Sequence, residues 1–238
     1  MRLIGDCHLH TTASGHAYST IGEYANEAAK KGLELIAMTD HGPKMPGTSS
    51  ILHFENLKII PDSMCGVEIL KGMEANIIDY DGSLDTGNLD VSRLQVLIAS
   101  FHDVCLPSMG KEENTKAMIN AMKNRYVNIL GHPDDSRVEV DYRELAKAAA
   151  DYGVLLEVNN SSLRPTSFRL NAAENYEKLL EECEKYKVYI IINSDSHIHT
   201  DVGEFAEALE LIKKFKYPEE LIANANISRL KERLNLRR

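Results

Sequence analysis

Residues 2–10, RLIGDCHLH, form a short apolar run that ends in two histidines. Six further runs rich in Ile, Leu and Val follow: LELIAMTDH (33–41), EILKGMEAN (68–76), QVLIASFH (95–102), VNILGHP (127–133), VLLEVNN (154–160) and VYIIINSDSH (188–197). Most of them are nearly continuous in apolar residues, which is typical of parallel strands that are buried on both faces. The runs therefore predict seven strands.

Helical patterns separate several of these strands. The predicted helices span residues 19–32, 141–153, 171–186 and 204–215. Asp141 is a candidate N-cap, and Gly32 and Gly153 are helix-ending glycines. Seven strand units in 238 residues average about 34 residues each, which is the length of repeated βα units. We expect an α/β fold, a distorted TIM-like barrel with seven units instead of eight, in one domain over residues 1–238.

Two connections depart from the simple βα pattern. Residues 43–66 are rich in loop formers and predict at most a short helix from about Phe54 to Ile59. Residues 76–88, NIIDYDGSLDTGN, predict a β-hairpin that turns at Asp81-Gly82.

Composition narrows the range of functions. The chain is 43% hydrophobic and 26% charged, as in an ordinary soluble globular protein. Its net charge of −9 repels nucleic-acid backbones, so nucleic acid is disfavoured as a partner. The sequence shows no membrane-spanning run and no signal peptide, and its 4 cysteines are scattered, so we expect a cytoplasmic protein. The sequence does not indicate an oligomeric state.

Potential metal ligands stand at the ends of six of the seven predicted strands. They are His8 and His10, His41, Glu74, His102, His132, and Asp195 with His197, whereas the sixth strand ends at Asn159. The carboxyl ends of barrel strands converge on one face, where active sites are built. Residues two apart on a strand face the same side, so each close pair shares one cavity. His16 lies just beyond the first strand and can fold over the same mouth. By the same alternation, Cys7 is expected on the opposite face of the strand from the two histidines, where it has a packing role.

The alternative is a set of independent, hydrogen-bonded histidines. It would crowd neutral imidazoles and two carboxylates into one cavity, where buried carboxylates are costly without positive charge. A cluster of divalent cations satisfies all of these groups together. The pattern therefore favours a polynuclear metal site.

The motifs DCHLHTTASGHAYST, MTDHGP, GMEANI, FHD, GHPDD, EVNNSS and SDSHI occur in this order along the chain. In this order and spacing they resemble the PHP (polymerase and histidinol phosphatase) family, and most closely its YcdX-like phosphatases. The resemblance runs from residue 3 to the C-terminal helix. It implies a distorted (β/α)7 barrel that holds up to three divalent metals, with zinc expected first and manganese or iron as alternatives.

Carried over position by position, the resemblance implies three ligand sets. The first metal takes His8, His10, Glu74 and Asp195; the second takes His102 and His132 and shares Glu74; the third takes His16, His41 and His197. No position of the motif set is replaced, which implies an active site. His53 and His199 fall outside the set. His199 is expected near the mouth, where it could touch the substrate, but the interpretation as a surface histidine is favoured.

Other polar residues are predicted to support the ligands. Asp6 shares the strand parity of the first two histidines, and Asp40 precedes His41, so either could accept a ring N–H and fix a tautomer. Glu157 interrupts an apolar run and faces the barrel interior, which favours a hydrogen bond to a ligand over direct chemistry. Asp103, next to His102, either supports a ligand from outside the metal site or is an ordinary loop residue.

The predicted chemistry is hydrolysis of a small-molecule phosphate monoester. Two metals that share a carboxylate can activate a bridging hydroxide and clamp both oxygens of an in-line displacement. Glu74 and Asp195 are then the catalytic ligands. Three divalent cations would move the net charge from −9 to about −3, so an anionic phosphate can bind. Arg164 follows the sixth strand, where the resemblance implies a substrate-binding arginine, and Arg169 is a weaker candidate for that role.

Three other functions fit parts of the pattern. An amidohydrolase also begins with H-x-H on its first strand, but Glu74 and the third histidine set fit the PHP pattern better. A PHP-type nuclease or phosphodiesterase is disfavoured by the acidic surface. A non-catalytic metal-binding domain would keep the site without turnover.

Overall fold

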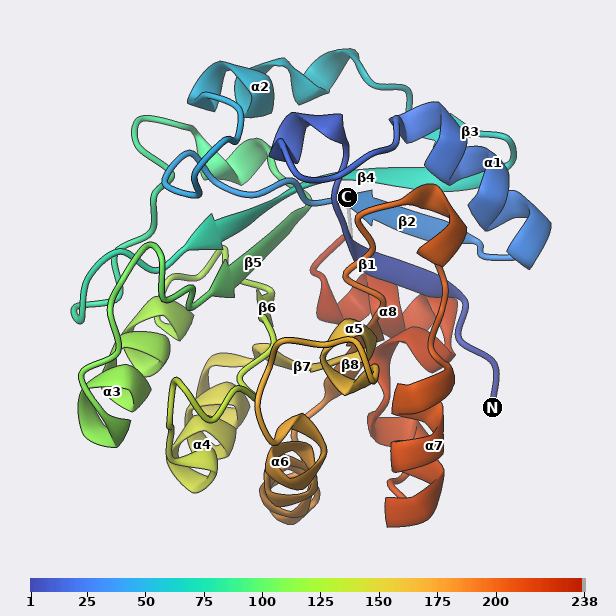
Figure 1. Ribbon diagram of the computed structural model, residues 1–238. Helices are drawn as coiled ribbons and strands as arrows, with labels where there is room; N and C mark the ends of the chain where they lie inside the picture. Colours follow the sequence, from blue (N-terminus) through green and yellow to red (C-terminus); the bar gives the residue numbers. More distant parts are fainter. Residues whose placement is uncertain (237–238) are drawn as a thin grey trace.

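The computed structural model describes residues 1–236, in which seven parallel strands curve into a nearly closed barrel (Figure 1). In spatial order the strands are β1 (Gly5–Leu9), β2 (Leu35–Met38), β4 (Val67–Asn76), β5 (Val96–Ser100), β6 (Ile129–Leu130), β7 (Leu155–Asn159) and β8 (Ile190–Asn193). Each strand pairs in parallel with the next along this path. The predicted seven-unit α/β barrel is confirmed.

Helices cover the outside of the barrel and close one of its ends. They are α1 (Ile21–Lys31), α2 (Ile51–Asn56), α3 (Lys111–Met122), α4 (Tyr142–Tyr152), α5 (Asn160–Leu163), α6 (Ala172–Tyr186), α7 (Ala206–Phe215) and α8 (Ile227–Arg233). The four predicted helices correspond to α1, α4, α6 and α7. Asp141 caps α4 by accepting from two backbone N–H groups, and Gly153 ends that helix in the left-handed conformation. No helix within residues 1–236 has the length and apolar character needed to cross a bilayer.

The two irregular connections differ in part from prediction. In the first, α2 continues into a 3-10 turn at Leu57–Ile59, so the helix starts three residues earlier than expected. That connection also contains β3 (Ser63–Met64), which pairs antiparallel with β4 through a turn at Cys65 and Gly66 that we did not predict. Both turn residues have positive φ, 52° and 81°, as tight hairpin turns require.

The hairpin predicted over residues 76–88 is only partly formed. Gly82 turns the chain with φ 81°, and the Asp79 carboxylate accepts from the backbone N–H groups of Asp81 and Ser83. A single antiparallel bridge between Ile77 and Leu84 takes the place of a ladder.

The barrel closes between β1 and β8 without a regular ladder. Near the mouth, the backbone N–H of His10 donates to the carbonyl of Ser196 at 2.9 Å. At the other end of the seam, the side chain of Asn224 lies between the strands. Its Nδ2 donates to the carbonyls of Gly5 at 2.9 Å and Ile192 at 2.6 Å, and its Oδ1 accepts from the N–H of Ile192 at 3.2 Å. This amide therefore joins the two strands where no backbone ladder forms.

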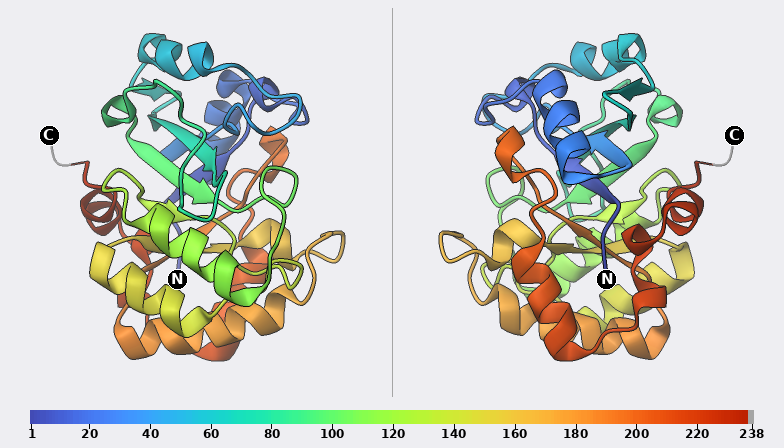
Figure 2. Two further views of the ribbon diagram at one scale, coloured as in Figure 1. Left: turned by 90° about the vertical axis from the view of Figure 1, so that its left-hand side faces the viewer. Right: turned by 90° about the vertical axis from the view of Figure 1, so that its right-hand side faces the viewer.

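An apolar floor lies beneath the mouth of the barrel. Leu230 and Leu234, from α8 and its end, pack there against inward residues such as Leu70 and Leu155. In Figure 2, α8 (dark red) lies at the opposite end of the barrel from the projecting loop of residues 164–171. The barrel is thus sealed at one end and open at the other.

Cys7 packs in this floor, so the predicted parity of β1 was wrong. Leu70 lies four residues before Glu74 on β4, and Leu155 lies two residues before Glu157 on β7, so both leucines face inward as the two glutamates do. Cys7 belongs to the same buried cluster as these leucines. The pairing of β1 with β2 shifts register between Asp6 and Leu9. Such a bulge reverses the alternation of side chains. Both Cys7 and the histidines after it therefore face inward.

Candidate metal centre

Glu74 occupies the middle of the barrel mouth, near the carboxyl end of β4, and is fully buried. Its Oε1 lies 2.8 Å from His132 Nε2, 3.3 Å from His8 Nε2 and 3.4 Å from His102 Nε2. Three strands therefore direct imidazole nitrogens at one carboxylate oxygen.

The second oxygen of Glu74 faces two further histidines. Oε2 contacts His41 Nδ1 directly and lies 3.7 Å from His10 Nε2. Burial would raise the pKa of Glu74, but the surrounding imidazoles, led by His41 and His8, hold it well below its ordinary value. Glu74 is therefore an ionised carboxylate inside a ring of five histidines.

Asp195 lies beside Glu74, just beyond β8. Its Oδ1 is 3.1 Å from His10 Nε2, 3.6 Å from His8 Nε2 and 3.7 Å from His197 Nδ1. Burial and the neighbouring imidazoles lower the pKa of His10 to about 3, so this ring is neutral and can act as a ligand.

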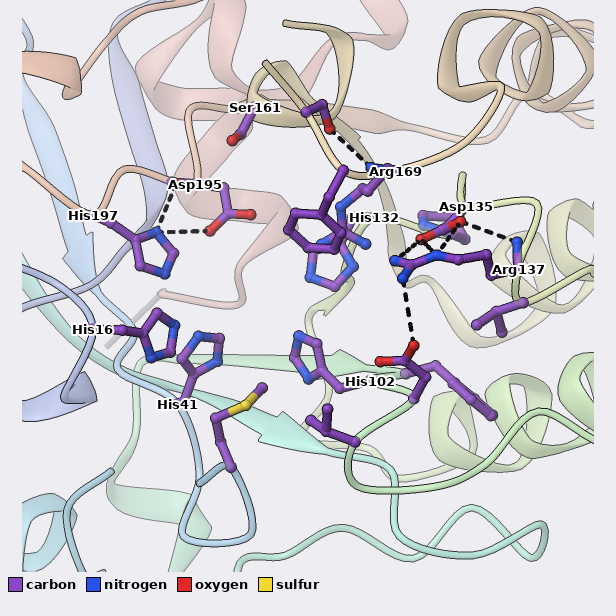
Figure 3. Close-up of a pocket in the computed structure, with 18 of the residues that line it drawn as sticks. His16, His41, His102, His132, Asp135, Arg137, Ser161, Arg169, Asp195 and His197 are labelled. Carbon is purple, nitrogen blue, oxygen red and sulfur yellow. Dashed lines mark hydrogen bonds and ion pairs between the residues drawn. The ribbon is translucent and has the colours of Figure 1, made fainter. Parts of the chain in front are cut away.

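His16, His41 and His197 lie together on the open side of the centre (Figure 3), and His41 and His197 also lie against His10. The His16 ring centroid lies 5.0 Å from that of His41 and 4.9 Å from that of His197. Gly15 turns the chain back over the mouth with φ 77°, where a Cβ atom would lie 2.0 Å from the carbonyl oxygen of Gly47. A glycine is therefore required immediately before His16.

The buried donor atoms at the centre fit divalent metal ions. His8 Nε2, His10 Nε2, His41 Nδ1 and Glu74 Oε2 are all buried and none makes a regular hydrogen bond, although His41 Nδ1 and Glu74 Oε2 are in direct contact. Buried polar atoms in native proteins nearly always have partners, and these four are directed at one another. Neutral imidazoles and a carboxylate are also the ligand types that zinc, manganese and iron accept. Bound divalent metal ions would satisfy every one of these atoms.

Four overlapping groups of three side chains could each hold an ion. They are His10, His41 and His197; His8, His132 and Asp195; His8, His10 and Glu74; and His41, Glu74 and His102. Eight of the nine predicted ligands occur in these groups. The ninth, His16, stacks on the rings of His41 and His197. The structure thus brings together the whole predicted set.

Glu157 contacts two of the predicted ligands from beneath, and the predicted hydrogen bond to one of their rings is present. Its Oε1 lies 2.8 Å from His8 Nδ1, and its Oε2 accepts from the backbone N–H of His132 at 2.9 Å. A carboxylate can only accept here, so it holds a proton on His8 Nδ1, and the opposite nitrogen, Nε2, faces the centre.

Asn76 supports His102, a role that sequence reasoning missed. Asn76 Oδ1 lies 2.7 Å from His102 Nδ1, and Asp85 holds the amide by accepting from Asn76 Nδ2 at 2.6 Å. The signal was present, because Asn76 stands two residues after Glu74 on one strand and so shares its face.

Asp40 and Asp6, which were predicted to accept a ring N–H from a ligand histidine, have other hydrogen-bond partners. Asp40 reaches no ligand ring directly; it accepts from Ser14 Oγ at 2.6 Å and lies 3.2 Å from His53 Nε2. Although burial opposes the shift, hydrogen bonds from His53 and Ser14 lower the pKa of Asp40 to about 2. The prediction for Asp6 was wrong, because the register shift in β1 turns this carboxylate toward Ser194, whose Oγ lies 2.5 Å away.

Two other predicted candidates lie at the edge of the site or outside it. Asp103 forms an ion pair of 3.5 Å with Arg137 at the rim. His199 Nδ1 lies 2.9 Å from Ser19 Oγ, outside the cavity lining.

A cavity of about 680 Å³ opens over the centre, within the usual size range of small-molecule sites. Arg164 and Arg169 both line it, but they differ in their partners. The Arg164 guanidinium forms an ion pair with Asp201. Arg169 lies beside His132 in Figure 3, and within residues 1–236 no carboxylate accepts a hydrogen bond from its guanidinium.

Known proteins with similar sequences or folds agree with this architecture. A protein of Thermoanaerobacter sp. (strain X514) that is named "Probable phosphatase" is 48% identical to this chain, over 98% of this chain and 95% of its own length. A protein with the same name in Acetivibrio thermocellus is 43% identical, also over 98% of this chain and 95% of its own length. The crystal structure of histidinol phosphate phosphatase from Lactococcus lactis, complexed with zinc, L-histidinol and phosphate, has a similar fold, with a TM-score of 0.65 at 20% identity over 92% of this chain and 95% of that one. The PHP domain model matches residues 6–225. The chain therefore belongs to the PHP domain family.

Proposed function

We propose that this protein is a metal-dependent phosphatase that hydrolyses a small phosphate monoester at a centre of three divalent ions. The observation that carries the proposal is the buried Glu74 carboxylate, which five imidazoles surround and whose Oε2 makes no regular hydrogen bond. The names of the relatives and the phosphate-bound neighbour support the reaction class. We further propose one domain over residues 1–238 and a cytoplasmic location, which stay predictions.

The proposed ligand sets follow the sequence motifs. The first ion is held by His8, His10, Glu74 and Asp195; the second by His102, His132 and Glu74; the third by His16, His41 and His197. The position of Glu74 supports a shared role, since its two oxygens face different histidines. Zinc is the proposed metal because the structural neighbour contains it, with manganese and iron as alternatives.

The residues of this chain divide the work of the reaction. When bound, the ions supply a water of lowered pKa and positive charge for the phosphate oxygens. Glu157 and Asn76 hold their histidines with Nδ1 protonated, so that the opposite nitrogens point at the centre. The apolar floor seals the barrel below, and the substrate therefore enters and leaves through the mouth.

Arg169 is the arginine best placed to bind the substrate phosphate. Its guanidinium is free of carboxylate hydrogen bonds within residues 1–236, whereas Arg164 is already paired with Asp201. We expect Arg169→Ala to lower kcat/KM for p-nitrophenyl phosphate by about 10- to 100-fold, since a hydrogen bond to a charged group contributes about 1.5–3 kcal/mol. Arg164→Ala is the matched control, with an expected change below about threefold. A larger loss in the Arg164 variant would assign the phosphate to that residue instead.

Metal content is the first test of the proposal. Protein purified without chelators or added metal should carry about three ions per chain by plasma mass spectrometry, and chelation should abolish phosphatase activity until zinc or manganese is restored. About two ions would indicate a weaker third site. No ions and no uptake on reconstitution would refute the proposed centre.

A substrate panel then separates the competing functions. Phosphate monoesters should be hydrolysed, while amides, amino-purines and single-stranded DNA should not. Cleavage of DNA would favour a nuclease, and hydrolysis of amides would favour an amidohydrolase. A fully loaded centre that turns over no substrate in the panel would indicate a metal-binding domain.

A further inference from the structure

Ser14 lies at a junction between the two strands that carry His10 and His41. It ends the 3-10 turn η1 (Thr12–Ser14) and is fully buried. Its Oγ lies 2.6 Å from Asp40 Oδ1, 3.1 Å from the backbone N of His41 and 3.3 Å from His10 Nδ1. One hydroxyl thus contacts a carboxylate, the backbone of one proposed ligand and the ring of another.

The direction of each hydrogen bond follows from counting protons. A hydroxyl has one proton to donate and two lone pairs that accept. The carboxylate of Asp40 can only accept, and it is held in place by Thr11, whose backbone N and Oγ1 donate at 2.7 Å and 2.8 Å. The Ser14 proton therefore goes to Asp40, and the N–H of His41 uses one lone pair. The remaining lone pair can only accept, so His10 Nδ1 carries a proton.

This tautomer leaves His10 Nε2 as a lone pair. That atom is buried without a hydrogen-bond partner and faces Asp195 Oδ1 at 3.1 Å and Glu74 Oε2 at 3.7 Å. His10 also belongs to two of the side-chain groups that could hold an ion, one with Glu74 and one with His41. The orientation of this ring therefore affects two neighbouring metal positions.

We propose that Ser14, anchored by Asp40, is a positioning residue that fixes His10 in its metal-binding tautomer and holds the backbone at His41. His53 of α2 extends the junction, since its Nε2 lies 3.2 Å from the second oxygen of Asp40. The inference rests on the proposed metal centre but not on the identity of the substrate.

The test measures the ring and the metal directly, with zinc as the probe. In zinc-loaded protein labelled with ¹⁵N-histidine, we expect a sharp Nδ1–H signal for His10 that broadens through exchange with water in Ser14→Ala. Zinc affinity, measured by competition with a chromophoric chelator, should fall by about 10- to 100-fold at the affected positions, as for other residues that orient ligands.

Ser194→Ala is the matched control. It also removes a buried hydroxyl that bonds an aspartate, at 2.5 Å from Asp6, but Ser194 Oγ contacts no proposed ligand ring. Its zinc affinity should stay within about twofold of the parent protein. An equal loss in both variants would show general destabilisation and would overturn the proposal, as would an unchanged His10 signal in Ser14→Ala.

Asp40→Ala provides a second, independent variant in case Ser14→Ala does not fold. Without the carboxylate, the Ser14 hydroxyl loses the acceptor of its proton, so the serine proton is released and the His10 tautomer is no longer fixed. We expect the same loss of the Nδ1–H signal, and its full retention would contradict the proposal. Because none of these measurements uses a phosphate ester, a failure of the phosphatase assay alone would leave the inference standing.

Discussion

Glu74→Ala is expected to abolish hydrolysis while leaving the barrel folded. Within residues 1–236, the substitution removes the only carboxylate whose oxygens face five of the proposed histidine ligands. Metal content should fall from about three ions to about one, because two of the proposed sites share this side chain. A bound metal supplies several kcal/mol of transition-state stabilisation, so kcat/KM for a phosphate monoester should fall at least about a thousandfold. Plasma mass spectrometry and steady-state kinetics give the two measurements.

Glu68→Ala on the same strand is the control for Glu74→Ala. Glu68 is partly exposed and pairs with Lys231 at 2.6 Å, far from the mouth, so its loss should change neither metal content nor turnover. Far-ultraviolet circular dichroism checks that both variants keep the fold. Full metal content together with unchanged turnover in Glu74→Ala would exclude a bridging role.

Asp195→Asn is expected to lower kcat about a hundredfold and to weaken the first metal site. The carboxylate lies 3.1 Å from His10 Nε2 and 3.6 Å from His8 Nε2, and an amide is a far weaker ligand for a divalent cation. Asp195 has φ 52°, a conformation that asparagine tolerates well among residues with a side chain. The backbone should therefore be unchanged, and the loss can be assigned to the missing charge.

The exposed Asp90 provides a neutral comparison for this substitution. Asp90→Asn also removes one acidic charge, but outside the cavity. Turnover and metal content should match the parent protein. Equal turnover in the Asp195 and Asp90 variants would remove Asp195 from the proposed first site.

The barrel and its ligands could be predicted because they follow from one simple regularity. Strands covered on both faces must be apolar along their length, so a polar residue that ends such a run marks the carboxyl end of a strand. Parallel strands bring all of those ends to one mouth. His102 and His132, 30 residues apart in the sequence, thus both reach the same Glu74 oxygen.

Local irregularities escaped prediction because they depend on neighbours in space. The register shift in β1 arises from its pairing with β2, and it reversed the predicted directions of Asp6 and Cys7. Helix α3 was not predicted because its buried face includes Asn114 and Thr115, which interrupt the apolar pattern, and its N-cap is Gly110 without a side-chain hydrogen bond. Asn114 is satisfied there by the carbonyl of Glu139, a partner that the sequence pattern does not indicate.

The roles of the rim residues also depend on loop conformation. Arg164 and Arg169 are five residues apart on one loop, and the sequence favoured Arg164 as the phosphate ligand, with Arg169 as the weaker candidate. Only the folded chain places Asp201 beside the first and leaves the second facing His132. The resemblance to the family indicates that an arginine belongs there, and the local ion pair distinguishes the two candidates.

The amide of Asn224 has a consequence for the order in which the chain can fold. Gly5 and Asn224 are 219 positions apart, so the contact between them has almost the greatest sequence separation that the chain allows. Contacts of this kind form slowly, because the entropy of closing a long loop must be overcome before they contribute any stability. During synthesis on a ribosome, β1 emerges first but must wait for nearly all the rest of the chain before its outer edge is covered. Until that moment β1 has an unpaired edge, which exposes this seam to wrong pairing in the newly made protein.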